Sequence, residues 1–313
     1  RAVSGGAPRA YLYLAEGLAF CSAGVVGTVV HLDGTRSAAA GAVVVNTVHN
    51  VAADAVDDRL IFIFHLHFPL YAVYCALFRA AYKEFFMAIF AIGDLHLSLG
   101  AQKPMDVFPG WQGYVQRLEA NWRRLVQPQD TVVIAGDISW AMKLEDTAAD
   151  FAFLEGLPGQ KLLLKGNHDY WWCTARKMET WFAAQGFGSL RLLHNNSCTA
   201  EGKALCGTRS WMFEPGEAHD EKVMARELGR LRMSLEAAGA GLEKLVFLHY
   251  PPVFPGASAP QITAMLGEYG VKRCFYGHLH GASIHRAVQG LVDGVEYRLI
   301  SADSLGFCPY KVL

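Results

Sequence analysis

Apolar runs of strand length alternate with longer amphipathic stretches in the second part of the chain, from Met87 onward. Five short runs rich in Val, Ile, Leu and Phe have the composition of buried strands. They cover residues 88–92, 131–135, 161–164, 244–248 and 274–276. Between them, residues 111–126 and 220–235 carry apolar side chains at roughly helical spacing, which predicts amphipathic helices. The alternation predicts one domain of the α/β class, or a layered α+β domain.

Each of the five predicted strands is followed within three residues by Asp, Asn or His. These polar groups are Asp94 with His96, Asp137, Asn167 with His168 and Asp169, His249, and His278 with His280. In four of the five groups a Gly directly precedes the polar residue, which lets the backbone turn sharply and approach a ligand. Because ligands of α/β sheets bind at the carboxyl ends of the strands, we expect these side chains to share one site.

The residue types at these strand ends indicate a metal centre. Imidazole nitrogens with carboxylate and amide oxygens, and without thiolates, suit Mn, Fe, Zn, Ni or Co. In Asp94-x-His96 and His278-x-His280, residues i and i+2 on an extended backbone would point the same way and could converge on metal. Seven candidate ligands exceed the needs of one catalytic ion with an open position. They suit two ions about 3.5–4 Å apart that share a carboxylate.

Each of these motifs is weak when taken singly. A lone Gly-Asp is more often a turn, and a lone His at a strand end is more often a polar cap. Taken together, the five groups are stronger evidence for a metal site, because all of them occur in order and each follows an apolar run.

Composition and charge exclude several classes of protein. The chain is 52% apolar and 18% charged, so it is not disordered overall. Its net charge of −1, from 28 basic and 29 acidic residues, gives no electrostatic case for a nucleic-acid-binding surface. The seven cysteines are odd in number and no pair has C-x-x-C spacing, which argues against a disulfide framework or a Cys zinc site. We therefore expect a reducing compartment and a cytoplasmic protein.

Residues 1–86 do not follow the pattern of the rest of the chain. They contain no Trp and show no clear helical or strand period. Residues 60–78 carry no charge and are long enough to span a bilayer, although two His and one Pro within them weaken that interpretation. We expect no membrane association unless this stretch is a real anchor.

A start at Met87 explains the contrast between the two parts. The Lys83-Glu84 pair can be encoded by a purine-rich ribosome-binding sequence, and two Phe codons separate it from Met87. This favours a translated upstream region, with a membrane anchor and a genuine N-terminal extension as alternatives. We therefore treat residues 1–86 as an atypical segment outside the native domain, and residues 87–313 as the functional domain.

The five polar groups match D-x-H, GD, GNH[DE], H and GHxH, in that order. With these motifs the sequence resembles the calcineurin-like metallophosphoesterases, in particular their shorter single-domain bacterial members. The resemblance runs from about Met87 to the C-terminus and is specific as a set. It implies the metallo-dependent phosphatase fold, a four-layer α-β-β-α sandwich, with a dinuclear metal site.

The resemblance also implies a role for each polar residue. Two groups of three ligands would hold one ion each, namely Asp94, His96 and His280, and Asn167, His249 and His278. Asp137 would bridge both ions. His168 would not bind metal but would face the leaving-group oxygen, as proton donor or to stabilise charge there. Asp169 would orient and charge-tune His168.

The activity implied by the resemblance is that of a metal-dependent phosphoric ester hydrolase. A hydroxide bridging the two ions, manganese or another of the metals above, would attack phosphorus in line. We expect a small phosphate ester as substrate, with a phosphodiester or nucleotide slightly favoured over a monoester. The alternatives are a non-catalytic metal-binding scaffold of the same fold and a membrane-tethered phosphoesterase.

One departure from the family bears on substrate. After Asp137 the chain lacks the Asp-Arg pair of the Ser/Thr protein phosphatases, so we do not expect protein phosphatase activity. Arg209 could replace the missing phosphate contact or could be a structural Arg. Aromatic residues near the motifs could line the pocket or pack in the core. They are Trp140, Tyr170, Trp171, Trp172, Trp211 and Tyr250.

Overall fold

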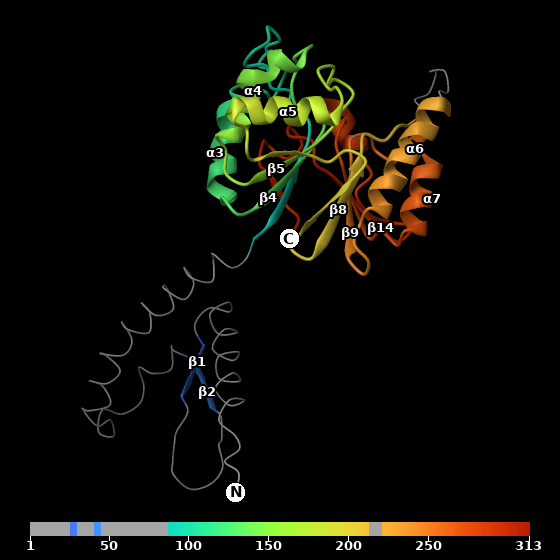
Figure 1. Ribbon diagram of the computed structural model, residues 1–313. Coiled ribbons are helices and arrows are strands. Elements are labelled where there is room, and N and C mark those ends of the chain that lie inside the picture. The colour runs from blue at the N-terminus through green and yellow to red at the C-terminus, as the bar shows by residue number, and fades with distance from the viewer. Residues whose placement is uncertain (1–25, 30–40, 45–86, 213–220) are drawn as a thin grey trace, which may run out of the picture. The chain divides into compact units, whose positions relative to one another are not determined.

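The computed structural model in Figure 1 describes residues 26–29, 41–44, 87–212 and 221–313. The chain divides into two units, residues 1–81 and 82–313. In the first unit, β1 (Val26–Val29) pairs antiparallel with β2 (Gly41–Val44). Residues 60–78, for which a membrane anchor was the alternative interpretation, and the proposed start signal before Met87 lie outside the described residues. Within the described part of the chain, no helix has the length and apolar character needed to cross a membrane.

The second unit is built on two sheets. The five-stranded sheet has the order β15-β3-β4-β5-β6, and the six-stranded sheet has the order β13-β14-β12-β9-β8-β7. The first consists of β3 (Ile89–Ile92), β4 (Thr131–Ala135), β5 (Gln160–Leu164), β6 (Leu190–Leu192) and β15 (Tyr310–Lys311). The second consists of β7 (Ser197–Ala200), β8 (Lys203–Thr208), β9 (Glu243–Leu248), β12 (Arg273–Tyr276), β13 (Gly290–Val292) and β14 (Val295–Leu299). A short pair, β10 (Val253–Phe254) and β11 (Ala257–Ser258), lies outside both sheets.

The inner strands of each sheet run parallel. In the first sheet β3, β4, β5 and β6 are parallel, and in the second β8, β9, β12 and β14 are parallel. Antiparallel strands close three of the edges: β15, β7 and β13. The carboxyl ends of the parallel strands therefore meet at one edge of each sheet, where a ligand site of this class is expected.

Helices cover the outer face of each sheet, as Figure 1 shows. The helices α3 (Tyr114–Leu125), α4 (Ala148–Glu155) and α5 (Ala175–Gln185) pack on the first sheet, and α6 (Glu221–Glu236) and α7 (Pro260–Glu268) on the second. Two 3₁₀ turns, residues Leu144–Thr147 and Gly281–Arg286, complete the elements.

Side chains that point alternately to the two faces of each strand produce these layers. In β3, Ile89 and Ala91 face the core between the sheets, whereas Phe90 and Ile92 join the core under α3, α4 and α5. In β9, Phe247 likewise lies in the core between the sheets. Successive side chains of a strand point to opposite faces, so strands apolar at every position fill two cores at once. The predicted fold class is confirmed: the chain is α/β, with two sheets flanked by helices.

The strand boundaries agree closely with those predicted from the sequence. All five predicted strands exist and differ by at most one residue at their amino ends. The helix predicted at residues 111–126 begins later, at Tyr114, because Gly113 before it has a left-handed backbone with φ 58°. The inner strands β8 and β14, the edge strands, and the helices α4, α5 and α7 were not predicted from the sequence.

Candidate metal centre

The loops after β3 and β4 run side by side and bring the first two motifs together. Asp94 N donates to Gly136 O at 2.9 Å, and His96 N donates to Asp137 O at 2.9 Å. Because each loop uses the other's backbone groups, Asp94, His96 and Asp137 are positioned by main-chain hydrogen bonds. All three side chains are buried, with at most 4% of each residue exposed.

The backbone at these positions is left-handed, and the expected extended conformation is wrong. The φ angles are 57° at Asp94, 44° at His96, 49° at Asp137 and 72° at His278. Residues other than Gly seldom adopt positive φ, and such conformations persist where the surrounding structure over-determines them. The paired side chains of Asp94 and His96 therefore converge because each loop residue turns, and not through the alternation of a strand.

Two glycines leave room for the carboxylates. A Cβ at Gly166 would lie 2.1 Å from Asp137 Oδ1, and a Cβ at Gly277 would lie 2.4 Å from Asp94 Oδ2. Both distances are shorter than any real contact of a Cβ atom. The Gly that precedes Asn167 and the Gly that precedes His278 are thus required by the carboxylates of other strands.

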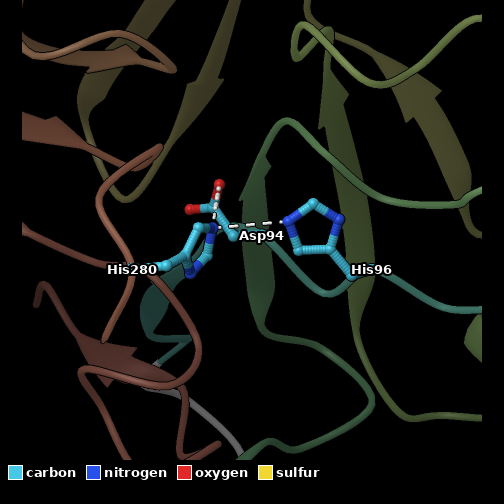
Figure 2. Close-up of side chains that lie close together, drawn as sticks. All are labelled: Asp94, His96 and His280. Carbon is cyan, nitrogen blue, oxygen red and sulfur yellow. Dashed lines mark hydrogen bonds and ion pairs between the residues drawn. The ribbon is translucent and has the colours of Figure 1, made fainter. Parts of the chain in front are cut away.

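The first group consists of Asp94, His96 and His280, and Figure 2 shows their side chains converging. His280 Nε2 lies 3.3 Å from Asp94 Oδ1 and 3.3 Å from His96 Nε2. The three residues come from the loops after two strands, β3 and β12, that belong to different sheets. Two imidazole nitrogens and a carboxylate oxygen at these distances form a ligand set that suits a divalent transition metal.

The second group is centred on His249. Its Nδ1 lies 3.1 Å from Ala135 O, so the Nδ1–H donates to this carbonyl and Nε2 carries the lone pair. That Nε2 lies 2.6 Å from Asn167 Oδ1, which is also 3.0 Å from His278 Nδ1. Two acceptor atoms, Nε2 and Oδ1, therefore face each other closely. A metal ion bound to both atoms would satisfy this contact.

Asp137 lies between the two groups. Its Oδ2 is 3.7 Å from His96 Nε2, and its Oδ1 is 3.6 Å from His249 Nε2. A second set of close ligand atoms combines Asp94, Asp137 and His249. The carboxylate of Asp137 thus has one oxygen directed to each group, which is the arrangement that a bridging ligand requires.

Burial makes the charges of this centre interdependent. Burial, with Asp94 close by, raises the pKa of Asp137 to about 8. Burial alone would lower the pKa of His280, but Asp94 and Asp303 raise it to about 10. Burial lowers the pKa of His96 and that of His278 to about 3, so both imidazoles are neutral at pH 7. At pH 7 protons on Asp137 and His280 therefore balance the charge of this centre, and divalent cations fit the same donor set in place of those protons.

Asp303 supports the first group and was not predicted. Its Oδ1 lies 3.0 Å from His280 Nδ1, and its Oδ2 accepts a hydrogen bond from Gly281 N at 3.0 Å. A carboxylate on Nδ1 fixes the ring and leaves Nε2 directed at Asp94 and His96. Asp303 lies four residues after β14, in which the exposed Glu296 and Arg298 interrupt the apolar pattern, so the rule of a polar residue directly after an apolar strand did not find it.

Aromatic rings pack against the imidazoles of both groups. Trp140 stacks on His96 with ring centroids 4.8 Å apart, and Tyr250 lies 4.3 Å from His278. Trp111, which was assigned only to a helix, contacts both His96 and His280. Trp171 instead lies in the core under the helices, with 2% of its surface exposed. The predicted aromatic residues therefore divide between the site and the core.

His168 lies at the edge of the centre. Its backbone N donates to Asp137 Oδ1 at 2.8 Å, and its ring is 4.7 Å from that of Trp140. The ring is half-buried, and burial lowers its pKa, as does the nearby His249. Its Nδ1 lies 3.5 Å from the hydroxyl of Tyr170. The side chain is thus close to both groups without belonging to either.

The expected role of Asp169 requires correction. Its buried carboxylate makes no hydrogen bond to His168 among the described residues. Instead it accepts hydrogen bonds from four N–H groups at 2.7–3.1 Å. The donors are the backbone nitrogens of Gly166, Asp137 and Ile138 and the indole of Trp171. Asp169 therefore holds the loops after β4 and β5 together, and adjacency to His168 in the sequence did not predict its contacts.

A scan against protein-family models finds one family for this chain. Residues 87–282 match the model described as calcineurin-like phosphoesterase. No curated protein matches the chain.

Three of the similar solved structures come from bacteria. A protein of unknown function, AQ665 from Aquifex aeolicus, is 15% identical with a TM-score of 0.40, over 72% of this chain and 96% of that one. The phosphopantetheinyl hydrolase PptH from Mycobacterium tuberculosis is 14% identical with a TM-score of 0.45, over 72% and 95%. The protein TT1561 of Thermus thermophilus is 13% identical with a TM-score of 0.45, over 70% and 90%.

Replacement of Asp169 by Asn tests whether this carboxylate holds the loops after β4 and β5 together. The amide nitrogen would face N–H donors, so we expect the free energy of unfolding to fall by about 3 kcal/mol. We also expect the bound metal to decrease, because the loops of Asp137 and Asn167 would separate. Thermal unfolding and elemental analysis measure both effects, with the exposed Asp146→Asn as control. Normal stability and metal content with a shifted pH–activity profile would instead support the original role.

Metal binding to this centre should release protons. In the metal-free protein, His280 and Asp137 have pKa values of about 10 and about 8, so both are protonated at pH 7. A metal ion must displace these protons, so the apparent affinity should rise with pH. The rise should be about tenfold per pH unit for each proton released. Calorimetric titration with Mn²⁺ between pH 6 and 8, in buffers of different ionisation enthalpy, counts the protons. An affinity independent of pH would contradict these protonation states.

Proposed function

Because the chain belongs to the calcineurin-like phosphoesterase family, we propose that it hydrolyses small phosphate esters with two divalent metal ions. The first ion would be held by Asp94, His96 and His280, and the second by Asn167, His249 and His278. The observation that carries the proposal is the position of Asp137, whose two oxygens lie 3.7 Å from His96 Nε2 and 3.6 Å from His249 Nε2. A carboxylate placed in this way can be shared by two ions.

The residues of the chain divide the catalytic work. When bound, the ions would neutralise charge on the phosphoryl oxygens and lower the pKa of an attacking water. The Nδ1–H of His249 donates to Ala135 O, which keeps Nε2 directed into the centre. His280 is oriented in the same way by Asp303. Because hydrogen bonds orient these two imidazole rings before substrate binds, less reorganisation is needed when it does.

We propose His168 as the proton donor to the leaving alcohol. Its ring lies 5.8 Å from that of His96, close enough to meet an oxygen that leaves a phosphorus held between the two groups. Trp140 packs on both His96 and His168 and limits where the His168 ring can point. A positioned general acid of this kind contributes about 10²–10⁴-fold to the rate.

The substrate class remains that of small esters, with phosphodiesters or nucleotides favoured over monoesters. Trp140 occupies the end of the second motif, where the protein phosphatases carry an Asp-Arg pair. Its indole N–H donates to Met105 Sδ at 3.2 Å and Lys103 Nζ lies 4.3 Å from its ring centroid, so neither member of the Asp-Arg pair has a counterpart at this position. We infer that the substrate is recognised by other contacts than those of the protein phosphatases.

Hydrolysis of aryl esters tests the proposed function. The full chain is stripped with chelator, refilled with Mn²⁺, and assayed with p-nitrophenyl phosphate and bis-p-nitrophenyl phosphate. We expect metal-dependent turnover that falls about a hundredfold or more in His168→Ala, with unchanged metal content. Asp137→Asn should lose both turnover and bound metal, because the shared ligand is weakened. The exposed His285→Ala is the matched control and should behave as the wild type.

The outcomes separate the alternatives. Two bound ions without hydrolysis of either ester would contradict the enzyme and support a metal-binding scaffold. Loss of metal in His168→Ala would show that this residue is a ligand and not the proton donor. The same assay on residues 87–313 tests the proposed domain boundary. If residues 87–313 are the functional domain, they should have the same specific activity as the full chain.

A further inference from the structure

Two cationic residues border the metal centre at the ends of neighbouring strands. Thr208 pairs with Leu248 in the parallel register of β8 and β9, so Arg209 follows β8 where His249 follows β9. The backbone of Tyr250, next to His249, donates to Arg209 O at 2.9 Å. In the other sheet, Leu164 pairs with Ala135, so Lys165 lies beside Gly136 and one residue from Asp137 along the sheet edge.

One buried carboxylate, Glu227, forms ion pairs with both Arg209 and Arg230. Glu227, 1% exposed, accepts hydrogen bonds from Arg209 Nη2 at 3.1 Å and from Arg230 Nη1 at 2.7 Å. Thr208 Oγ1 donates to its other oxygen at 2.7 Å. Lys165 lies within electrostatic reach of Arg209, Arg230 and Glu227. Two arginines therefore share Glu227, and Lys165 lies near them and near Asp169, whose carboxylate accepts N–H donors.

Both cations have hydrogen-bonding capacity that the chain does not use. Lys165 is half-buried, yet its amine has no hydrogen-bond or ion-pair partner among the described residues. Arg209 has one acceptor, Glu227, and its buried Nε has no partner in the described part of the chain. Ser210 Oγ, next along the chain, is buried and also lacks a partner there. The buried unsatisfied atoms, Arg209 Nε and Ser210 Oγ, require an explanation in a native structure, and a bound anion provides one.

We propose that Arg209 and Lys165 form a subsite for a second anionic group of the substrate, so that the preferred substrate is a phosphate ester bearing a further phosphoryl group. The subsite lies beside His249 and the Gly136–Asp137 loop, where a group attached to the scissile phosphate could reach it. This inference rests on the proposed function, because the bound molecule is a substrate only if the protein hydrolyses phosphate esters. Binding of the anion can be measured separately from hydrolysis.

Calorimetric titration with ADP and AMP tests the subsite, using the full chain at a fixed free Mn²⁺ concentration. The two ligands differ by one phosphoryl group, so the ratio of their dissociation constants reports the added contact. We expect this preference for ADP to fall about tenfold in Arg209→Met, and several-fold in Lys165→Met. Arg226→Met, which removes an exposed cation one residue from Glu227, is the matched control and should leave the ratio unchanged.

A second variant distinguishes a structural role of Arg209 from a role in anion binding. Arg209→Met leaves buried Glu227 with one cation fewer and should lower the melting temperature. In Arg209→Met/Glu227→Gln the charge balance is restored, so stability should recover while the ADP preference stays low. Lys165 has no partner to lose among the described residues, so Lys165→Met should fold normally in any case. An unchanged ADP-to-AMP ratio in both folded variants would overturn the subsite.

Hydrolysis of bis-p-nitrophenyl phosphate by the wild type is measured in the same preparation. Metal-dependent hydrolysis with an unchanged ratio would contradict the subsite and leave the proposed function standing. A reduced ratio without any ester hydrolysis would support the subsite and contradict the proposed function.

Discussion

The structure depends on keeping two carboxylates, Asp94 and Asp137, buried close together. Each is 2% exposed or less, and the imidazoles nearest to them include two, His96 and His278, that burial keeps neutral. Like charges in such a place repel strongly unless cations share the site. Without metal, the fold meets this constraint by holding protons on Asp137 and His280. With metal, the same atoms become ligands, so proton and metal compete for one centre.

The surrounding fold positions these carboxylates through the backbone. The loops after β3 and β4 exchange main-chain hydrogen bonds, and Asp169 fastens the loop after β4 to that after β5. Gly166 and Gly277 have no side chains because Asp137 and Asp94 occupy that space. Strands of both sheets contribute ligands, so the two sheets must pack correctly before the centre exists. The core between them, which includes Ile89 and Phe247, is therefore as necessary to the site as the ligands themselves.

Much of this arrangement was readable in the sequence, and the failures have physical causes. The strands and their polar ends could be predicted because a buried parallel strand is apolar throughout and a turn into a ligand site needs Gly. The left-handed backbone of Asp94 and His96 could not, because it arises from pairing between two loops. Asp169 was misjudged because the side chains of adjacent residues can point in different directions, and that of Asp169 points to the backbone of the loops after β4 and β5. Asp303 was missed because its loop, after β14, carries no Gly-Asp or Gly-His motif.

Anomalous diffraction from crystals of the Mn²⁺-loaded protein tests the central claim most directly. Data collected at the manganese absorption edge locate each bound ion independently of any activity. We expect two peaks about 3.5–4 Å apart, with Asp137 between them. One peak should lie beside His96 and His280, and the other beside Asn167 and His249. A single peak, or two peaks that Asp137 does not join, would contradict the dinuclear centre.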